Sequence, residues 1–223
     1  MNQRTQSGVT TSDLVRSARV GNNADLFPDV LRLHVPLGST VADVTYGEGV
    51  FWRKINPDDY TVLASDIKTG TDCRSLPHAD DSLDAVVLDP PYMEGFFRTS
   101  SRAGSGTHAA LSRRYSSGGE ADATGPKHQA AVLHFYLQAT AEAQRVLRPG
   151  GVLILKCQDA VSAGRQHLTH VDIVNALRAR GMYAKDLFVL VRPGRPSVSR
   201  ILQQVHARKA HSYFLVFTKG AAR

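Results

Sequence analysis

The sequence predicts a single α/β domain built on a doubly wound, mostly parallel sheet that is flanked by helices. Short runs of apolar and β-branched residues recur along the chain, with helical stretches between them. These runs are nearly continuous instead of alternating with polar residues, which is typical of strands buried on both faces. The 223 residues, 42% of them hydrophobic, suffice for one sizeable core. Such alternation of strands and helices implies right-handed crossovers.

The individual elements follow from composition and spacing. The clearest helix covers about 129–148, where apolar residues form one stripe and Pro149-Gly150-Gly151 ends the helix. A second helix covers about 171–180 and a third about 199–208. The segments with the composition of strands are 41–44, 60–67, 84–89, 152–157, 187–191 and 213–217.

Two segments do not follow this alternation. Residues 1–20 have the character of a polar, poorly ordered arm, which leaves 21–223 as the folded domain. Residues 95–128 contain six glycines and little apolar periodicity. A loop of this length in a compact domain is usually a lid or a binding loop, so we expect a flexible insertion there.

Composition argues against several classes of protein. No stretch approaches the roughly 20 continuous apolar residues of a membrane span, and the first residues lack the apolar region of a secretory signal. Cys73 and Cys157 lie far apart, so neither a disulfide scaffold nor a cysteine zinc site is expected, and a cytoplasmic location fits. His167 and His170 have an i,i+3 spacing. We expect them to lie at an exposed helix start and not to bind a metal.

The positive charge is concentrated in two segments. The net charge is +7; residues 95–128 hold five Lys and Arg against two acids, and residues 192–210 hold five and no acid. This distribution favours a polyanion partner, and two solvated loops without a partner are the alternative. The residues expected to contact nucleic-acid phosphates are Arg98, Arg102, Arg113, Arg114, Arg192, Arg195, Arg200, Arg208 and Lys209.

A glycine-containing loop, Asp43-Val44-Thr45-Tyr46-Gly47-Glu48-Gly49, follows the first of these strands. We expect a helix after it. Glycines there permit a tight turn and the close approach of a ligand to the backbone. In open α/β sheets, ligands bind at the carboxyl ends of the strands. The third glycine of the dinucleotide pattern is missing, which argues against NAD and leaves nucleoside cofactors without a pyrophosphate.

Two aspartates extend this candidate site. Asp66 ends the next strand, where its carboxylate can accept hydrogen bonds from both hydroxyls of a ribose. Asp72 precedes the following strand and can accept a hydrogen bond from an adenine amino group. The structural alternatives are an exposed loop acid for Asp66 and an ordinary turn residue for Asp72.

The run Asp89-Pro90-Pro91-Tyr92 follows an apolar strand and indicates the reaction class. Two prolines cannot continue a central strand, so the chain turns there with restricted φ. The turn holds the Asp89 carboxylate and the Pro90 carbonyl as two acceptors for the N–H groups of an exocyclic base amine. Accepting both bonds draws the nitrogen toward tetrahedral geometry and directs its lone pair at an electrophile. Tyr92 can stack on the base; the alternative is a structural proline turn.

With these motifs in one order, the chain resembles the S-adenosylmethionine-dependent amino-group methyltransferases that act on adenine N6 or cytosine N4 in DNA. The similarity extends to Leu26-Phe27-Pro28-Asp29-Val30-Leu31, to 147–156 and to 210–219, which resemble that family's N-terminal cofactor motif, fifth strand and last strand. It implies a Rossmann-like class I methyltransferase fold with seven strands. The implied cofactor-binding residues are Phe27, Pro28, Asp43, Thr45, Gly47, Gly49, Asp66 and Asp72, and the implied catalytic residues are Asp89, Pro90, Pro91 and Tyr92.

The implied activity is methyl transfer to adenine N6 in DNA, with the target base flipped out of the duplex and a restriction-modification system as a familiar setting. Some RNA guanine-N2 methyltransferases share N/D-P-P-Y, so cytosine N4 in DNA and an RNA base amine stay open. We find no separate target-recognition domain. Sequence preference would then come from 95–128, from 192–210, from a homodimer or from a partner specificity subunit.

Overall fold

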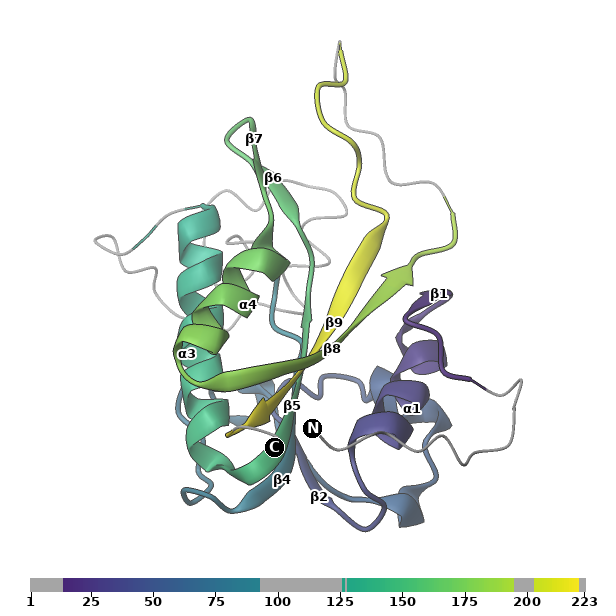
Figure 1. Cartoon of the computed structure of the whole chain (residues 1–223), viewed down its shortest axis with the longest axis vertical. Helices are drawn as coiled ribbons and strands as arrows, with labels where there is room; N and C mark the ends of the chain where they lie inside the picture. The colour runs from purple at the N-terminus through teal and green to yellow at the C-terminus, as the bar shows by residue number, and fades with distance from the viewer. Residues whose placement is uncertain (1–13, 93–125, 127, 195–202, 221–223) are drawn as a thin grey trace, which may run out of the picture.

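The computed structural model describes residues 14–92, 126, 128–194 and 203–220. Its centre is a seven-stranded sheet with the order β1-β8-β9-β5-β4-β2-β3 (Figure 1). Its strands are β1 (Ala18–Val20), β2 (Thr40–Asp43), β3 (Thr61–Ala64), β4 (Leu83–Leu88), β5 (Leu147–Cys157), β8 (Met182–Val191) and β9 (His211–Lys219). Only the two pairings that involve β9 are antiparallel. The predicted class, a mostly parallel α/β sheet, is confirmed.

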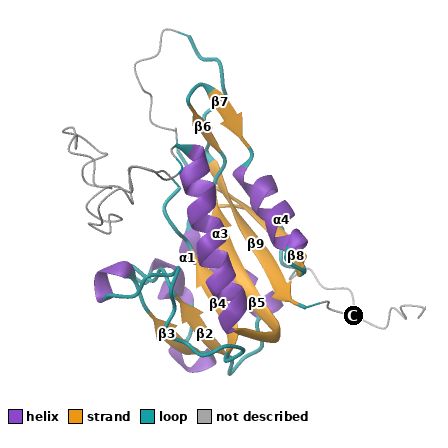
Figure 2. Cartoon of the chain, turned by 90° about the vertical axis from the view of Figure 1, so that its left-hand side faces the viewer, coloured by secondary structure: helices purple, strands orange, loops and turns teal. Residues whose placement is uncertain are grey.

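Helices cover both faces of this sheet (Figures 1 and 2). On one face lie α1 (Asn23–His34) and the 3₁₀ helix η1 (Val50–Lys54), and on the other lie α3 (Gln129–Val146) and α4 (Thr169–Ala179). Successive residues of β4 serve the two faces in turn. Ala85 and Val87 pack with the α1 side, whereas Val86 and Leu88 pack with the α3 side. Burial on both faces explains why the strand sequences are continuously apolar.

Four expectations about the elements need correction. The expected arm, residues 1–20, includes β1, which pairs with β8 and adds the seventh strand. Residues 203–208 of the expected third helix are not helical. The helix α3 ends at Val146, because Leu147 is already extended (ψ 132°), and Pro149-Gly150-Gly151 lies within an irregular start of β5. Sequence patterns also missed α1, whose core face includes Leu26, Phe27, Val30 and Leu31.

A small hairpin and two further short 3₁₀ helices complete the described chain. The hairpin consists of β6 (Ala160–Ser162) and β7 (Arg165–His167), which pair with each other outside the main sheet. The 3₁₀ helices η2 (Pro57–Asp59) and η3 (Ile67–Thr69) flank β3. Among the described helices, none combines the length and the apolar character needed to cross a membrane.

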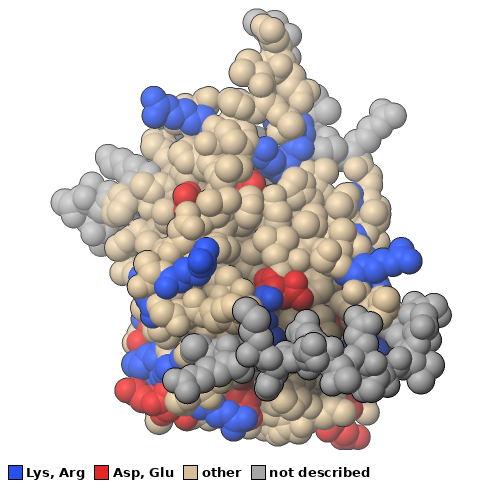
Figure 3. Space-filling model, in the orientation of Figure 1, with Lys and Arg blue, Asp and Glu red and all other residues tan. Residues whose placement is uncertain are grey.

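Charge is unevenly distributed over the face seen in Figure 3. Lys and Arg side chains occur from the top to the bottom of this face, whereas most of the visible Asp and Glu surface lies at the centre and the lower edge. The expected insertion, 95–128, lies outside the described residues except for Pro126 and His128.

Candidate active site

The candidate site lies where four parallel strands end together. Asp43 is the last residue of β2, Asp66 follows β3, Asp89 follows β4, and Lys156 is the penultimate residue of β5. These strands are neighbours in the order β5-β4-β2-β3 and run in the same direction, so their carboxyl ends form one edge. This is the edge at which open α/β sheets bind ligands.

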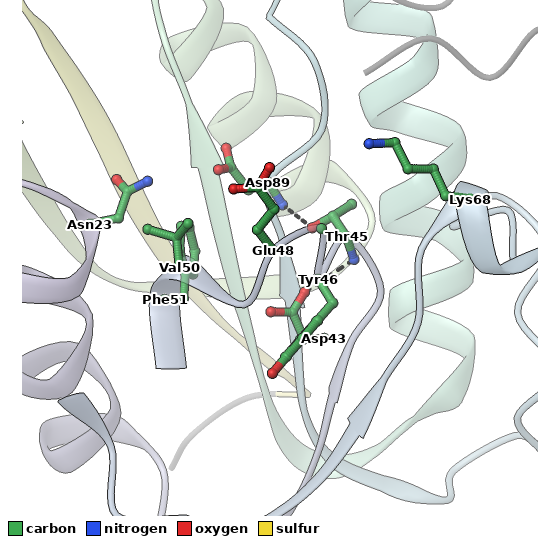
Figure 4. Close-up of a pocket in the computed structure, with 10 residues that line it drawn as sticks. Asn23, Asp43, Thr45, Tyr46, Glu48, Val50, Phe51, Lys68 and Asp89 are labelled. Atoms are coloured by element: carbon green, nitrogen blue, oxygen red, sulfur yellow. Dashed lines mark hydrogen bonds between the residues drawn. The ribbon is translucent and has the colours of Figure 1, made fainter. Parts of the chain in front are cut away.

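Thr45 joins the glycine loop to the D-P-P-Y turn. Its hydroxyl accepts a hydrogen bond from the backbone N–H of Asp89 at 2.7 Å, and its own N–H donates to Asp43 Oδ1 at 3.1 Å. Figure 4 shows Asp43, Thr45 and Asp89 arranged along this junction with both bonds drawn. These two bonds therefore link the loop that follows β2 to the residue that begins the turn after β4.

Asp43 has a buried carboxyl group that accepts hydrogen bonds from two N–H donors. Thr45 supplies one, and the indole Nε1 of Trp52 donates to Oδ2 at 2.7 Å. Burial raises the pKa of Asp43 to about 7, because removing the carboxylate from water disfavours the charged form. The two donors oppose this rise, and the carboxylates of Asp89 and Asp66 add to it.

The glycine loop has the backbone conformation for which glycine is suited. Gly47 and Gly49 have φ values of 54° and 64°, and a Cβ atom on Gly49 would lie 2.7 Å from the hydroxyl of Tyr46. The expected helix after the loop is the short 3₁₀ helix η1. The carboxylate of Asp66 accepts hydrogen bonds from the N–H groups of Gly47 (3.2 Å) and Lys68 (3.0 Å), so this predicted ribose acid lies beside the loop.

The loop separates two hollows that share Thr45, Gly47 and Asp89 in their linings. The first is acidic; it is lined by Asn23, Asp43, Thr45, Tyr46, Gly47, Glu48, Val50, Phe51, Lys68 and Asp89 (Figure 4). The second is more apolar; it is lined by Val44, Thr45, Gly47, Asp66, Ile67, Thr71, Asp72, Cys73, Arg74, Asp89, Pro90, Pro91 and Phe135. We call them the acidic lobe and the apolar lobe of one cleft.

The predicted residues divide between these lobes and the core. Asp72 lies at the apolar lobe, where Arg74 binds its carboxylate at 2.6 Å and lowers the pKa of Asp72. The guanidinium of Arg74 in turn lies over the ring of Phe135. Phe27 is fully buried against Phe51 and Trp52, and α1 contributes Asn23 to the lining instead of Phe27 or Pro28.

Asp89 is held by two side chains that come from different parts of the chain. The hydroxyl of Tyr92 donates to Oδ1 at 2.5 Å, and Lys156 Nζ lies 3.2 Å from Oδ2. Burial raises the pKa of Tyr92 well above its ordinary value, so its hydroxyl keeps the proton that it donates. The Asp89 carboxylate is thereby oriented at the point where the two lobes meet.

Lys156 is the charged residue in contact with Asp89 that sequence reasoning missed. Its side chain is only 3% exposed, and its ammonium lies 5.1–5.8 Å from the ring centres of Tyr92, Phe51 and Phe214. Burial lowers the pKa of Lys156, and the carboxylate of Asp89 opposes this change. The available signal was a lysine at the end of a continuously apolar strand, since such a charge needs a partner.

The predicted phosphate-binding residues are only partly described. Arg98, Arg102, Arg113, Arg114, Arg195 and Arg200 lie outside the described residues. Arg192 and Arg208 are exposed and Lys209 is half-exposed. Arg192 directly follows β8, and Arg208 and Lys209 lie shortly before β9. Both strands reach the sheet edge there, because Val191 pairs with His211.

Comparison with known proteins gives a likeness of fold. No family model and no curated protein matches the sequence. Among solved structures, a protein from Bacillus halodurans assigned as a methyltransferase has a TM-score of 0.51 at 13% identity, with 87% of this chain and 99% of that chain covered. The cyclase SpnF has a TM-score of 0.50 at 15% identity, with 89% and 82% covered. The chain has the Rossmann-like fold of these proteins.

TrmN from Thermus thermophilus is also similar, with a TM-score of 0.47 at 17% identity. The match covers 87% of this chain and 48% of TrmN, so the chain spans about half the length of that protein. Because SpnF is a cyclase with the same fold, the fold by itself does not specify the reaction. The chemistry depends on the residues of the cleft.

The Asp89–Lys156 pair predicts coupled effects on stability. Asp89→Asn leaves a buried ammonium without its counter-charge and should lower the free energy of unfolding by about 3 kcal/mol. Adding Lys156→Met removes that charge, so the double variant should be more stable than Asp89→Asn alone. Urea unfolding of the wild type, both single variants and the double variant measures this coupling.

The matched control is the ion pair of Lys219 and Asp81, in which the two charged groups are 2.6 Å apart. The side chain of Asp81 is largely exposed to solvent. The effects of Lys219→Met and Asp81→Asn should add to within about 0.5 kcal/mol. If the Asp89 and Lys156 effects add equally well, the two side chains do not form the stabilising pair described above.

The raised pKa of Asp43 predicts a pH dependence of stability. Between its ordinary value of 3.8 and about 7, the folded chain keeps a proton on Asp43 that the unfolded chain has lost. This group therefore makes stability fall as pH rises through that window, by up to a few kcal/mol. Asp43→Asn removes the dependence. The wild-type minus Asp43→Asn difference in unfolding free energy should fall from pH 4 to pH 8, and a flat difference would refute the assignment.

Proposed function

We propose that this chain is an S-adenosylmethionine-dependent methyltransferase acting on an exocyclic amine of a nucleic-acid base, with adenine N6 in DNA as the first candidate. The observation that carries the proposal is the Asp89 carboxylate. It is held from two sides by Tyr92 and Lys156, and it lines both lobes of the cleft. A carboxylate fixed in this way suits the orientation of an amine beside a bound methyl donor.

The two lobes suit the two halves of this cofactor. S-adenosylmethionine, when bound, supplies a methyl group made electrophilic by a sulfonium cation. Of the carboxyl groups in the acidic lobe, Asp89 is already paired with Lys156, so Asp43 and Glu48, against one lysine, Lys68, are the groups that favour a cationic ligand. The apolar lobe has Ile67, Cys73 and Phe135 for a purine ring, with Asp66 beside the loop for the ribose hydroxyls.

Asp89 and Pro90 would then orient the target amine. The amino lone pair of adenine or cytosine is delocalised into the ring, which makes the nitrogen a poor nucleophile. Hydrogen bonds from both N–H groups to the Asp89 carboxylate and the Pro90 carbonyl favour a tetrahedral nitrogen whose lone pair faces the methyl group. Positioning and electrostatics of this kind are the protein's contribution, since the sulfonium already activates the methyl group.

We expect Tyr92 to change partner when the base binds. Its hydroxyl donates to Asp89 Oδ1, an oxygen that can also accept a hydrogen bond from the amine. An entering base can replace that bond and receive the Tyr92 ring as a stacking surface, worth about 1–3 kcal/mol. Lys156 stays on Oδ2, so the carboxylate keeps its counter-charge while its other oxygen is exchanged.

The positive charge concentrated in 95–128 and 192–210 supports a polyanionic, nucleic-acid substrate. Arg192, Arg208 and Lys209 lie by the ends of β8 and β9 that flank the site edge. Their phosphate contacts would weaken with salt. A duplex target requires flipping of one base, which costs a few kcal/mol. The D-P-P-Y turn suits adenine N6, cytosine N4 and an RNA base amine alike, and the assay below separates them.

The direct test is transfer of a tritiated methyl group from S-adenosylmethionine to duplex DNA and, separately, to RNA. Digestion to nucleosides followed by mass spectrometry then identifies the product. We expect N6-methyldeoxyadenosine from the DNA. Label recovered only in RNA nucleosides would replace DNA by RNA as the substrate, and no label in any base would refute the proposed function.

The role of Asp89 predicts a specific kinetic defect. Asp89→Ala should lower kcat by roughly 100-fold or more, while the affinity for S-adenosylmethionine changes little, because the side chain acts in the reacting complex. Asp89→Asn should also lower kcat strongly, since its NH₂ group faces the hydrogens of the amine. Single-turnover kinetics and cofactor titration measure the two quantities. An Asp89→Ala protein that unfolds early but turns over at the wild-type rate would make Asp89 a structural turn residue only.

A further inference from the structure

The β6–β7 hairpin has no role in the proposed chemistry, yet it lies at the same end of the molecule as the cleft. Its strands are connected by Ala163 and Gly164, both at positive φ (50° and 73°). Figures 1 and 2 show the hairpin extending beyond the main sheet. It leaves the sheet just after Lys156, the residue that contacts Asp89. A macromolecule bound by the hairpin would therefore lie next to the candidate active site.

The base of the hairpin is firmly attached to the sheet. Asp159 precedes β6 and His170 follows β7, and His170 Nδ1 lies 2.7 Å from Asp159 Oδ1. Tyr213, at the start of β9, stacks on His170 with ring centres 4.1 Å apart and donates to Asp159 Oδ2 at 3.3 Å. Asp159 is only 6% exposed. These contacts close the two ends of the hairpin around a buried carboxylate.

The turn of the hairpin is supported by the basic segment 203–209. His206 Nε2 lies 3.0 Å from the carbonyl oxygen of Gly164. Val161 of β6 lines a shallow recess together with Gln203, Gln204, Val205, His206, Ala207, Arg208 and Lys209. The hairpin and segment 203–209 thus make one projecting surface, and its exposed apolar side chains are Val161 and Val205.

The Lys, Arg, Asp and Glu residues of this projecting surface are all basic. Neither 160–168 nor 203–210 contains an Asp or Glu, whereas Arg165, Arg208 and Lys209 supply positive charge. The nearest acid in sequence, Asp159, is buried and bound to His170. Arg165 is exposed in β7. Most of the visible acidic surface in Figure 3 lies lower on the molecule. The chemistry of this surface therefore suits a polyanion.

We propose that the β6–β7 hairpin enters the major groove of duplex DNA, with Arg165 and segment 203–209 on the flanking phosphates. The major groove of B-form DNA is about 12 Å wide and about 8.5 Å deep, and it admits a two-stranded β-ribbon. The five residue-to-residue steps from Asp159 to Gly164 can span roughly 16 Å at about 3.3 Å per step, which exceeds the depth of the groove. The narrow major groove of A-form RNA does not admit such a ribbon.

This proposal rests on the proposed function and narrows its substrate to duplex DNA. It also gives the proposed enzyme an element that contacts the groove. The exposed side chain of Val161 on the hairpin suits apolar contact with thymine methyl groups, and Arg165 suits phosphate. The hairpin and the cleft then contact one duplex at neighbouring points.

The test compares the full-length wild type with Arg165→Ala. Binding is measured by fluorescence anisotropy to a mixed-sequence 30-base-pair DNA duplex, to one of its single strands and to the RNA duplex of the same sequence, over a series of salt concentrations. Arg165→Ala should weaken duplex DNA binding about threefold to tenfold and reduce the slope of log K against log salt by about one. Single-strand binding should change less than twofold, and duplex RNA binding should be weak and unaffected.

Arg178→Ala is the matched control, because Arg178 is an exposed arginine in the last turn of α4. It should leave all three affinities unchanged. Wild-type affinity of Arg165→Ala for duplex DNA, or an equal loss on all three probes, would overturn the proposal. Binding is read without methyl transfer, so the two proposals can fail separately. Duplex binding that depends on Arg165 in a chain that methylates no base refutes only the function, and methylation of DNA with a silent Arg165→Ala refutes only the hairpin.

Discussion

An ammonium group removed from water at the end of β5 constrains the whole candidate site. Lys156 is 3% exposed and surrounded by three aromatic rings, so its charge depends on the carboxylate of Asp89. The hydroxyl of Tyr136 on α3 also donates to the backbone carbonyl of Lys156 at 3.1 Å. Strand, helix and D-P-P-Y turn are therefore tied at one point, and Asp89 contributes to folding as well as to the proposed chemistry.

The two signs of charge are separated at this edge of the sheet. The cleft gathers Asp43, Glu48 and Asp89. Lys156 balances the charge of Asp89, and a proton or a bound cation would balance that of Asp43. The surface beyond the cleft, on the hairpin and segment 203–209, carries only positive charge. A cationic methyl donor and a polyanionic acceptor would thus be attracted to adjacent places. This arrangement would attract the methyl donor to the cleft and the nucleic acid to the basic surface. It would also disfavour binding of either substrate at the other's place.

Strong local patterns made much of the fold and the cleft predictable. Buried strands such as β4 and β5 are recognisable because both faces need apolar residues, and Asp43, Asp66 and Asp89 were found because they follow such strands. The sequence did not indicate which distant segments come into contact. Lys156 meets Asp89 across 67 residues, and β1 is an exposed three-residue strand defined only by its pairing with β8. The β6–β7 strands are too short for a periodic pattern. Segment 203–208 has helix-forming residues but is irregular, and its His206 contacts the hairpin turn.

The central claim is that Asp89 exchanges its bond with Tyr92 for a bond with the target amine while Lys156 stays in place. A crystal structure with S-adenosylhomocysteine and a DNA duplex containing an unpaired adenine tests it most directly. The account predicts adenine N6 within hydrogen-bond distance of Asp89 Oδ1 and of the Pro90 carbonyl oxygen, the Tyr92 ring stacked on the base, and Lys156 Nζ still on Oδ2. An adenine bound elsewhere, with Tyr92 still donating to Asp89, would contradict it.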